Sequence, residues 1–326
     1  MTAAGTPRPP APTAVGSVPP MVDAARSGRS EREQGYLVVA NAHAGTAEQP
    51  RVDAAVATLA AAGPTRLWRT GDVEELDRAL DGAVAAGHVI VAVGGDGSLH
   101  AVVARLWARS ELADAVVGVV PCGTGNDFAR GVDVPLEPIA AAEQIIAGRR
   151  RSLDLLVDGD GGVVVNAVHA GLGAVAAERA EGLKDRLGAA AYPVGAVLEG
   201  VRADGWSLTV TVDGTPLALP GDSVLMVGVG NGPSIGGGTL LCPGADPGDG
   251  LLDVVVSCAT GPAARLGFAS ALRSASHPER DDVVTARGAE VRISGDAVAY
   301  DADGELTGEV TDRTYRVLPG AWTLVC

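Results

Sequence analysis

The sequence Val89-Ile-Val-Ala-Val-Gly-Gly-Asp-Gly-Ser98 is the strongest indication of fold in this chain of 326 residues. Five apolar residues stop abruptly at three glycines that flank one carboxylate. Such a run is typical of a buried parallel strand, and ligands sit at the carboxyl ends of such strands. Glycine permits positive φ and close approach to a ligand, and a following helix offers its N-terminus to anions. We therefore expect Asp96 to lie where a phosphate-bound metal would be held and to carry little packing; the alternative is a tight turn with Asp96 as a cap.

Strand-like and helix-like patterns alternate on both sides of this stretch. In parallel sheets such alternation implies right-handed crossovers and helices on both faces, so the sequence predicts a Rossmann-like three-layer α/β domain. The expected elements are a strand over 35–40, a helix over 50–62, a strand over Thr65–Thr70, a helix over Val73–Ala86, a strand over Val89–Val93, a helix over Leu99–Trp107 and a strand over Val116–Val120.

After Gly148 the pattern changes to short apolar or alternating segments bounded by turn residues, which favours antiparallel sheet. A helix is expected over roughly 174–202. The expected strands are Ser152–Val157, Val163–Val168, Trp206–Val212, Val224–Gly230, Leu252–Ser257 and Glu290–Ser294. We therefore predict a flexible Pro-rich tail over 1–34, an α/β domain over 35–148 and a β-rich domain over 149–311.

The charge balance restricts the partners. A formal charge of −15, from 25 basic and 40 acidic residues, argues against nucleic acid as a partner. No stretch approaches about 20 uninterrupted apolar residues, so no membrane-spanning helix is expected. The four cysteines show no metal-ligand spacing, and a reduced cytoplasmic setting is the simpler interpretation.

A second polar loop follows the strand that ends near Val120. In Val119-Val-Pro-Cys-Gly-Thr-Gly-Asn-Asp-Phe-Ala-Arg130, Thr124 has a hydroxyl and an amide for phosphate oxygens, and Asn126 and Asp127 can orient water or metal. A lone Gly-Thr-Gly is weak evidence, because many loops contain one. Two such loops after neighbouring strands, each with an aspartate, are much less expected by chance than one loop alone.

Taken together, these motifs resemble the diacylglycerol kinase catalytic family, which includes sphingosine kinases and bacterial lipid kinases. The resemblance rests on both loops and on later motifs in the expected order, and it covers roughly residues 36–326. The later motifs are Asn231-Gly-Pro-Ser-Ile-Gly-Gly-Gly238, Pro243-Gly-Ala-Asp-Pro-Gly-Asp-Gly-Leu-Leu-Asp253, Asp303-Gly304-Glu305 and Leu187-Gly-Ala-Ala-Ala-Tyr192.

The resemblance implies an ATP-dependent lipid kinase that uses Mg²⁺ in a cleft between two domains. The ATP-binding domain would span 35–148 joined by about 312–326, and the β-rich lipid-substrate domain would span 149–311. Asp96 would belong to the metal and water network near the transferring phosphate. Asp249 would bind Mg²⁺ with the backbone carbonyls of Asp246 and Leu251, against the alternative of a solvated acidic turn. The nucleotide-binding residues implied are Asn41, Ala42, His43, Ala44, Gly45, Thr70, Gly94, Gly95, Asp96, Gly97, Ser98, Gly123, Thr124, Asn126 and Asp127.

Glu305 would be the general base that accepts the proton of the lipid hydroxyl. Phosphoryl transfer depends mainly on positioning and charge stabilisation, with a carboxylate that orients the nucleophile. The alternative is an ordinary exposed hairpin carboxylate. Asp301 and Asp303 lie close by in sequence, and only the Asp-Gly-Glu match favours Glu305.

The sequence departs from the family pattern at two places. The first loop reads Asn41-Ala-His-Ala-Gly45 followed by Thr46, without the usual proline and adjacent cation, and Ala101 stands where glutamate is common. Two rival interpretations stay open, a non-catalytic nucleotide- or lipid-binding regulator and an NAD kinase-like enzyme. The partner expected is a lipid at a membrane surface, reached by transient peripheral contact; a homodimer is left open.

Overall fold

The structure is a computed structural model that describes residues 34–42, 49–172, 174 and 205–326. These described residues all belong to one compact unit, Gln34–Cys326. The expected helix over 174–202, except for Ala174, and residues 1–33 of the expected tail fall outside the described residues. No described helix has the length and apolar character needed to cross a membrane.

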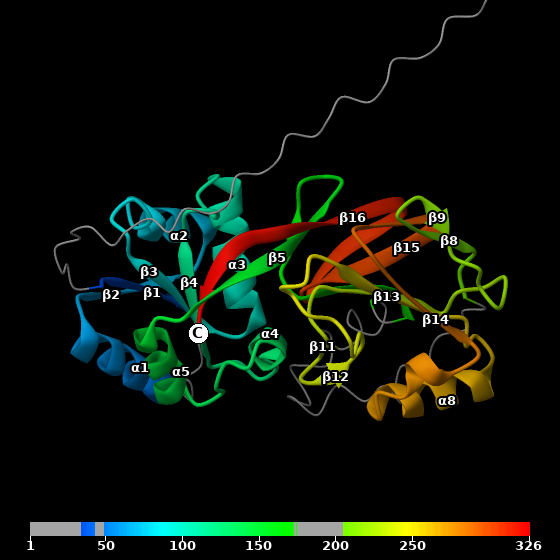
Figure 1. Ribbon diagram of the computed structural model, residues 1–326, viewed down its shortest axis with the longest axis horizontal. Helices are drawn as coiled ribbons and strands as arrows, with labels where there is room; N and C mark the ends of the chain where they lie inside the picture. The colour runs from blue at the N-terminus through cyan, green and yellow to red at the C-terminus, as the bar shows by residue number, and fades with distance from the viewer. Residues whose placement is uncertain (1–33, 43–48, 173, 175–204) are drawn as a thin grey trace, which may run out of the picture. The chain divides into compact units, whose positions relative to one another are not determined.

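The first half of this unit alternates strands and helices. Its strands pair in parallel in the order β2-β1-β3-β4, and helices cover both faces, with α1 packed against α5 and α2 against α3 (Figure 1). The elements are β1 (Tyr36–Asn41), α1 (Gln49–Ala62), β2 (Thr65–Thr70), α2 (Val73–Leu80), β3 (Val89–Gly94), α3 (Asp96–Ala108), β4 (Val116–Pro121), α4 (Asp127–Gly131) and α5 (Pro138–Ala147).

Two helices in this half differ from their expected bounds. Helix α2 ends at Leu80 instead of continuing to Ala86, because the chain then turns through Gly82 and Gly87, both at positive φ. Helix α3 begins three residues earlier than expected. Gly95 is its extended N-cap, so Asp96 is the first helical residue, where the helix dipole favours a carboxylate.

The second half is rich in strands and carries one described helix longer than three residues, α8. This helix lies against the short strand β12 (Figure 1). The elements are β5 (Arg150–Asp158), β6 (Val163–Val164), β7 (Ala167–Gly171), β8 (Leu208–Val212), β9 (Thr215–Pro216), β10 (Met226–Gly230), β11 (Ser234–Ile235), β12 (Thr239–Leu240), β13 (Leu252–Ser257), α8 (Pro262–Arg273), a 3₁₀ turn (His277–Glu279), β14 (Val283–Gly288), β15 (Glu290–Ala302) and β16 (Glu305–Val325).

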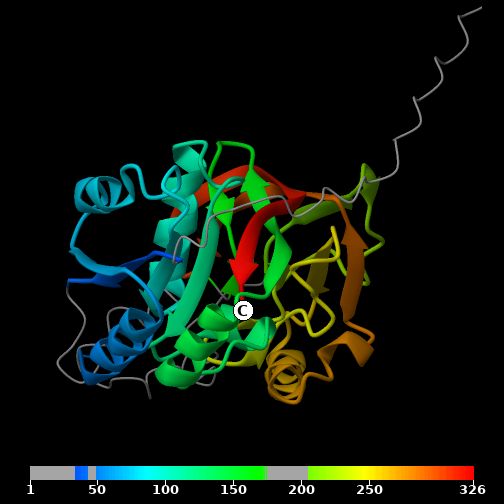
Figure 2. The same cartoon turned by 60° about the vertical axis from the view of Figure 1, so that its left-hand side comes forward.

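The long strand β16 connects the two halves of the sheet. Its first part pairs antiparallel with β15, and its last residues pair with both β5 and β4. Thr323 is in register with Val116 of β4, so the end of the chain adds a parallel strand to the N-terminal sheet. Figure 2 shows this red C-terminal end beside the green β5.

The hydrophobic core follows the same division. One cluster is formed by β1 to β5 and their helices and includes Trp322 and Leu324 from β16, while two further clusters fill the strand-rich half. Trp322 is almost fully buried and packs 5.7 Å from the ring of Phe128 on α4. The predicted fold class, an N-terminal α/β part and a C-terminal β-rich part, is therefore confirmed.

Several strands of the second half differ from the sequence expectation. The run expected as one strand over Val163–Val168 is divided into β6 and β7, because the N–H groups between them bond to Asp303 instead of to a ladder. Strand β15 continues through Gly295 to Ala302, with shifts of register against β16. Helix α8 was not expected, although Pro262 at its first turn is a common helix start.

Candidate active site

The Gly-Gly-Asp-Gly turn leaves β3 and enters α3 at the carboxyl edge of the parallel sheet. Gly94 has φ +156°, a conformation that side chains rarely adopt. The carboxylate of Asp96 accepts the backbone N–H groups of Asp127 and Phe128, each at 3.0 Å. Asp96 therefore holds the first turn of α4, and the expectation that it carries little packing was wrong.

Burial, hydrogen bonds and neighbouring charges act in opposite directions on the pKa of Asp96. Burial raises the pKa of its carboxyl group, and the N–H groups of Phe128 and Asp127 lower it. The negative charges of Asp127 and Asp303 raise it again, so the net pKa lies above the ordinary value. The structure thus places three carboxylates close enough to influence one another.

The second loop is tied to the first loop and to the triple-glycine segment. Asn126 adopts a left-handed conformation with φ 54°, and its amide nitrogen donates to the carbonyl of Gly123 at 2.8 Å. The Asp127 carboxylate accepts the N–H groups of Gly237 and Gly238, both at 2.7 Å. A chain of backbone-to-carboxylate bonds therefore runs from α3 through α4 to the strand-rich half.

The glycines of the two loops allow the backbones to touch. A Cβ atom added to Gly123 would lie 2.5 Å from the Cα atom of Gly95, so neither position accepts a side chain without a backbone shift. A Cβ atom added to Gly97, by contrast, would meet nothing within 4 Å. The first turn of α3 is therefore open beside Gly97, and a helix N-terminus with open space beside it suits a phosphate group.

The Asp-Gly-Glu turn joins β15 to β16. Asp303 adopts φ 51°, and its carboxylate accepts the N–H groups of Val165, Asn166 and Ala167 at 2.6, 2.9 and 3.0 Å. Nδ1 of His100 donates a hydrogen bond to the same carboxylate at 2.8 Å. Asp303 thus fixes the turn to α3 and to the segment between β6 and β7.

Glu305 follows this turn as the first residue of β16, and it is exposed. Its backbone is in ladder register with Ala302. Its negative charge contributes to raising the pKa of His100. Because Asp303, two residues earlier, is bonded to His100 on α3, the turn that carries Glu305 lies beside α3. An exposed carboxylate on a turn held in this way can accept a proton.

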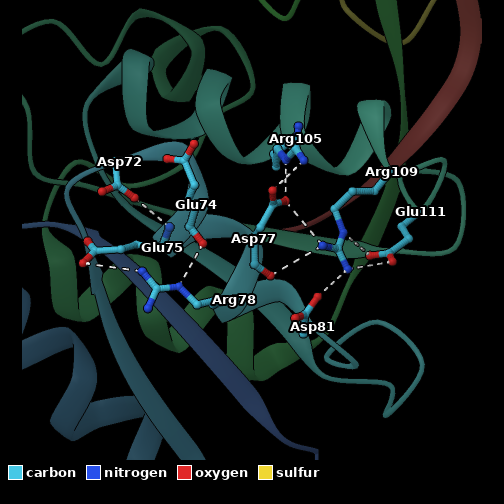
Figure 3. A network of polar contacts seen from close by, with 9 residues as sticks. All are labelled: Asp72, Glu74, Glu75, Asp77, Arg78, Asp81, Arg105, Arg109 and Glu111. Carbon is cyan, nitrogen blue, oxygen red and sulfur yellow. Dashed lines mark hydrogen bonds and ion pairs between the residues drawn. The ribbon is translucent and has the colours of Figure 1, made fainter.

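Helix α3 is anchored at its other end by a network of charged side chains. Asp77 on α2 bonds to both Arg105 on α3 and Arg109 directly after it (Figure 3). Arg109 also pairs with Asp81 and Glu111, each at 3.0 Å. The network fixes the C-terminal half of α3 to α2, so the turn around Asp96 stands at the end of a helix that is held in place.

The loop over Asp246–Leu251 differs from these turns. Its carboxylates accept nearby N–H groups, Asp246 from Gly248 at 3.1 Å and Asp249 from Leu251 at 3.0 Å. Asp249 also bonds to Arg287. Because a guanidinium faces Asp249, the donor set does not fit a ready Mg²⁺ site, and among the described residues no three His, Cys, Asp or Glu side chains gather to hold a metal. The assignment of Asp246, Asp249 and Leu251 stays a prediction.

The remaining predicted residues lie along the same sheet edge where they are described. Asn41 is the last residue of β1, and the N–H of the following Ala42 donates to the carbonyl of Thr70 at the end of β2. Ser98 stands in the first turn of α3, and Thr124 is exposed in the second loop. His43, Ala44 and Gly45 lie outside the described residues.

Two contributors to this site are assigned no role from the sequence alone. His100 follows Asp96 by four residues on one helix face, and this spacing is the one signal that could have indicated it. Asp303 is considered from the sequence only as a rival to Glu305. Arg51 on α1 supports the second loop, because it donates to the carbonyls of Pro121, Cys122 and Leu136 at 3.1 to 3.3 Å.

Comparison with known families adds to this geometry. The family model of the diacylglycerol kinase catalytic domain matches residues 35–157. The model of the YegS C-terminal NAD kinase beta sandwich-like domain matches residues 166–326. The first match therefore ends within β5, and the second begins directly before β7.

Curated relatives resemble this chain in sequence, and a solved structure resembles it in fold. The chain is 41% identical to "Probable lipid kinase YegS-like" of Stenotrophomonas maltophilia and 33% identical to the protein of that name from Yersinia enterocolitica, over 58% and 57% of this chain. The alignment spans 62% of the length of each relative, less than two thirds. A crystal structure of a diacylglycerol kinase from Bacillus anthracis is similar with a TM-score of 0.68 at 20% identity, covering 91% of this chain and 98% of that one. At this identity the likeness shows the fold alone.

Proposed function

We propose that this chain, which matches the model of a diacylglycerol kinase catalytic domain over 35–157 and that of a YegS C-terminal domain over 166–326, transfers the γ-phosphate of ATP to a hydroxyl group of diacylglycerol or a related lipid. The observation that carries the proposal is the convergence of three turns. The Asp96, Asp127 and Asp303 carboxylates connect the Gly-rich turn of α3, the second loop and the Asp-Gly-Glu turn.

In this proposal the phosphates of ATP lie at the N-terminus of α3, beside Gly97. The hydroxyl oxygen of the lipid attacks the γ-phosphorus, the bond from that phosphorus to the β–γ bridging oxygen breaks, and ADP leaves. Glu305 accepts the hydroxyl proton. Asp96 and Asp127 hold the loops in position through their bonds to backbone N–H groups.

A divalent cation bound to the ATP phosphates would neutralise charge that develops on the leaving group. We propose Mg²⁺, which prefers oxygen ligands and keeps several waters. The carboxylates of Asp96 and Asp127 already accept backbone N–H groups, so we assign neither of them to the cation.

The rival interpretations differ in what they require. An NAD kinase-like enzyme would phosphorylate a dinucleotide, and a non-catalytic regulator would bind without turnover. The exposed Glu305 beside the phosphate-binding turn favours catalysis over regulation, because a regulator has no use for a base there. Because the acceptor is a lipid, we also propose transient contact with a membrane surface.

The direct test is phosphoryl transfer from labelled ATP with purified protein. The acceptors are diacylglycerol, a sphingoid base, a total lipid extract and NAD, each in detergent micelles. We expect label in the diacylglycerol or extract products. Label in NAD alone would contradict the proposal, as would ATP binding without transfer to any acceptor.

The variant Gly97→Ala tests where the nucleotide binds. The new methyl group meets no protein atom within 4 Å, so the fold should be retained, but it occupies the space assigned to the phosphates. We expect KM for ATP to rise about tenfold or more, since roughly 1.4 kcal/mol of binding corresponds to tenfold. Gly261→Ala, also without atoms within 4 Å, is the matched control before α8 and should behave as the wild type.

A further inference from the structure

The contact between His100 and Asp303 is the one described side-chain ion pair that joins α3 to the Asp-Gly-Glu turn. The Asp303 side chain is only 2% exposed and that of His100 is 12% exposed. The bond therefore lies between buried groups, where it is stronger than at the surface. It connects the helix that begins with Asp96 to the turn that carries Glu305.

The charged surroundings of His100 favour its protonated form. Burial alone would lower the pKa of His100, but the hydrogen bond and the charge of Asp303, together with the charge of Glu305, outweigh burial and raise it. Strand β6 and the segment up to Ala167, which pack on the same side, carry no ionisable side chain. On α3 itself the nearest carboxylate is Asp96, four residues earlier, and on α2 the nearby Asp77 is occupied by Arg105 and Arg109.

We propose that His100 is a positioning residue for the phosphoryl transfer: held by Asp303, its charged ring fixes the turn of Glu305 against α3. This inference rests on the proposed function. When the ring loses its charge, the bond to Asp303 is no longer between opposite charges, so the turn is held less firmly.

The variant His100→Asn separates the charge from the hydrogen bond. An asparagine amide nitrogen stands where Nδ1 of histidine stands, so the donor to Asp303 is kept and the positive charge is lost. We expect kcat/KM of the wild type to fall as pH rises through the raised pKa of His100. In the variant this alkaline fall disappears, because the amide keeps the bond to Asp303 but carries no charge that is lost as pH rises.

Two further variants complete the kinetic experiment. His100→Ala removes both the charge and the donor, and should lower kcat further than His100→Asn while leaving KM for ATP within twofold. His88→Asn is the control, because His88 lies before β3 and outside the site. Wild-type protein and His100→Asn with the same pH profile would overturn the inference.

An NMR titration of the histidine ring signals tests the His100–Asp303 pair without an activity assay. The His100 signal is identified by its absence in His100→Asn. We expect it to titrate above 6.5, the ordinary value, and to shift downwards in Asp303→Asn, whose side chain is neutral. If the pKa of His100 were unchanged in Asp303→Asn, the inference that Asp303 holds the charged form of His100 would be overturned.

The two readouts keep the inference apart from the proposed function. If the protein transfers phosphate to lipid but wild type and His100→Asn have the same pH profile, only the role of His100 is wrong. A protein with a normal His100 titration but no transfer to any lipid removes the proposed function, and this role with it.

Discussion

Two groups of aspartates in this chain lie in glycine-containing turns that look alike and are used differently. Asp96 and Asp303 accept N–H groups from segments distant in sequence, and the backbone N–H donors to Asp303 lie up to 138 positions away. Asp246 and Asp249 accept N–H groups two residues further on, and an arginine lies beside each, Arg151 and Arg287. The first group determines how distant segments meet; the second group shapes a local turn. The difference lies in the partners of the carboxylates, which the motif itself does not contain.

The largest loss of stability is expected for Asp303→Ala. Three backbone N–H groups and His100 lose their acceptor in a buried place. With roughly 1 kcal/mol for each of these four donors, the free energy of unfolding should fall by about 4 kcal/mol. Urea unfolding measures it, with Asp246→Ala as the control from the other group. If Asp303→Ala and Asp246→Ala lost equal free energies of unfolding, the distinction between the two groups of aspartates would be wrong.

Asp96→Ala should come next. Two N–H groups at the start of α4 lose their acceptor, and we expect a loss of about 2 kcal/mol in the free energy of unfolding. Phosphoryl transfer should fall as well, because the second loop is no longer fixed to α3. A variant with full stability and no activity would mean that Asp96 acts only on the ligand.

His100→Asn should change stability in a pH-dependent way. The folded-state pKa of His100 is raised, so its charged pair with Asp303 stabilises the protein fully below about pH 6.5, the unfolded value. This stabilisation is lost as pH rises through the folded pKa. The difference in free energy of unfolding between wild type and variant should therefore be largest near pH 5.5 and smallest near pH 9. A difference that grows with pH would contradict the pair.

The smallest effect is expected for Asp249→Ala. Its carboxylate is 30% exposed and its bonds to Leu251 and Arg287 are accessible to water. Surface changes of this kind usually alter stability by less than about 0.5 kcal/mol. Thermal unfolding with and without Mg²⁺ sharpens the test. A rise in Tm with Mg²⁺ that the variant abolishes would assign this loop to the cation, as the family resemblance implies.

Much of the first half could be predicted from local pattern. The run Val89–Val93 followed by glycines identified β3 and the turn, because a buried strand and a helix start each have a short-range signal. Strand β16 could not be predicted at its full length. It passes through Pro319 and Gly320, which indicate a turn in sequence but coincide with a register shift against β5 in the structure.

The candidate site divides in the same way. The glycines and acidic residues of the loops could be found from motifs, because their chemistry is local. The roles of His100 and Asp303 could not, because a buried hydrogen bond between residues 203 positions apart leaves no mark in a single sequence. The same holds for Asp127, whose partners are Gly237 and Gly238.

The central claim is that Glu305 accepts the proton of a lipid hydroxyl while the nucleotide is held by the other half. The most direct measurement is the single-turnover rate of transfer from labelled ATP to diacylglycerol in Glu305→Gln, with Glu309→Gln on the same strand as the exposed control. The account predicts a fall of roughly 10²- to 10⁴-fold for Glu305→Gln, unchanged ATP affinity and unchanged stability, and a near-normal rate for Glu309→Gln. A Glu305→Gln protein that transfers phosphate at the wild-type rate would contradict it.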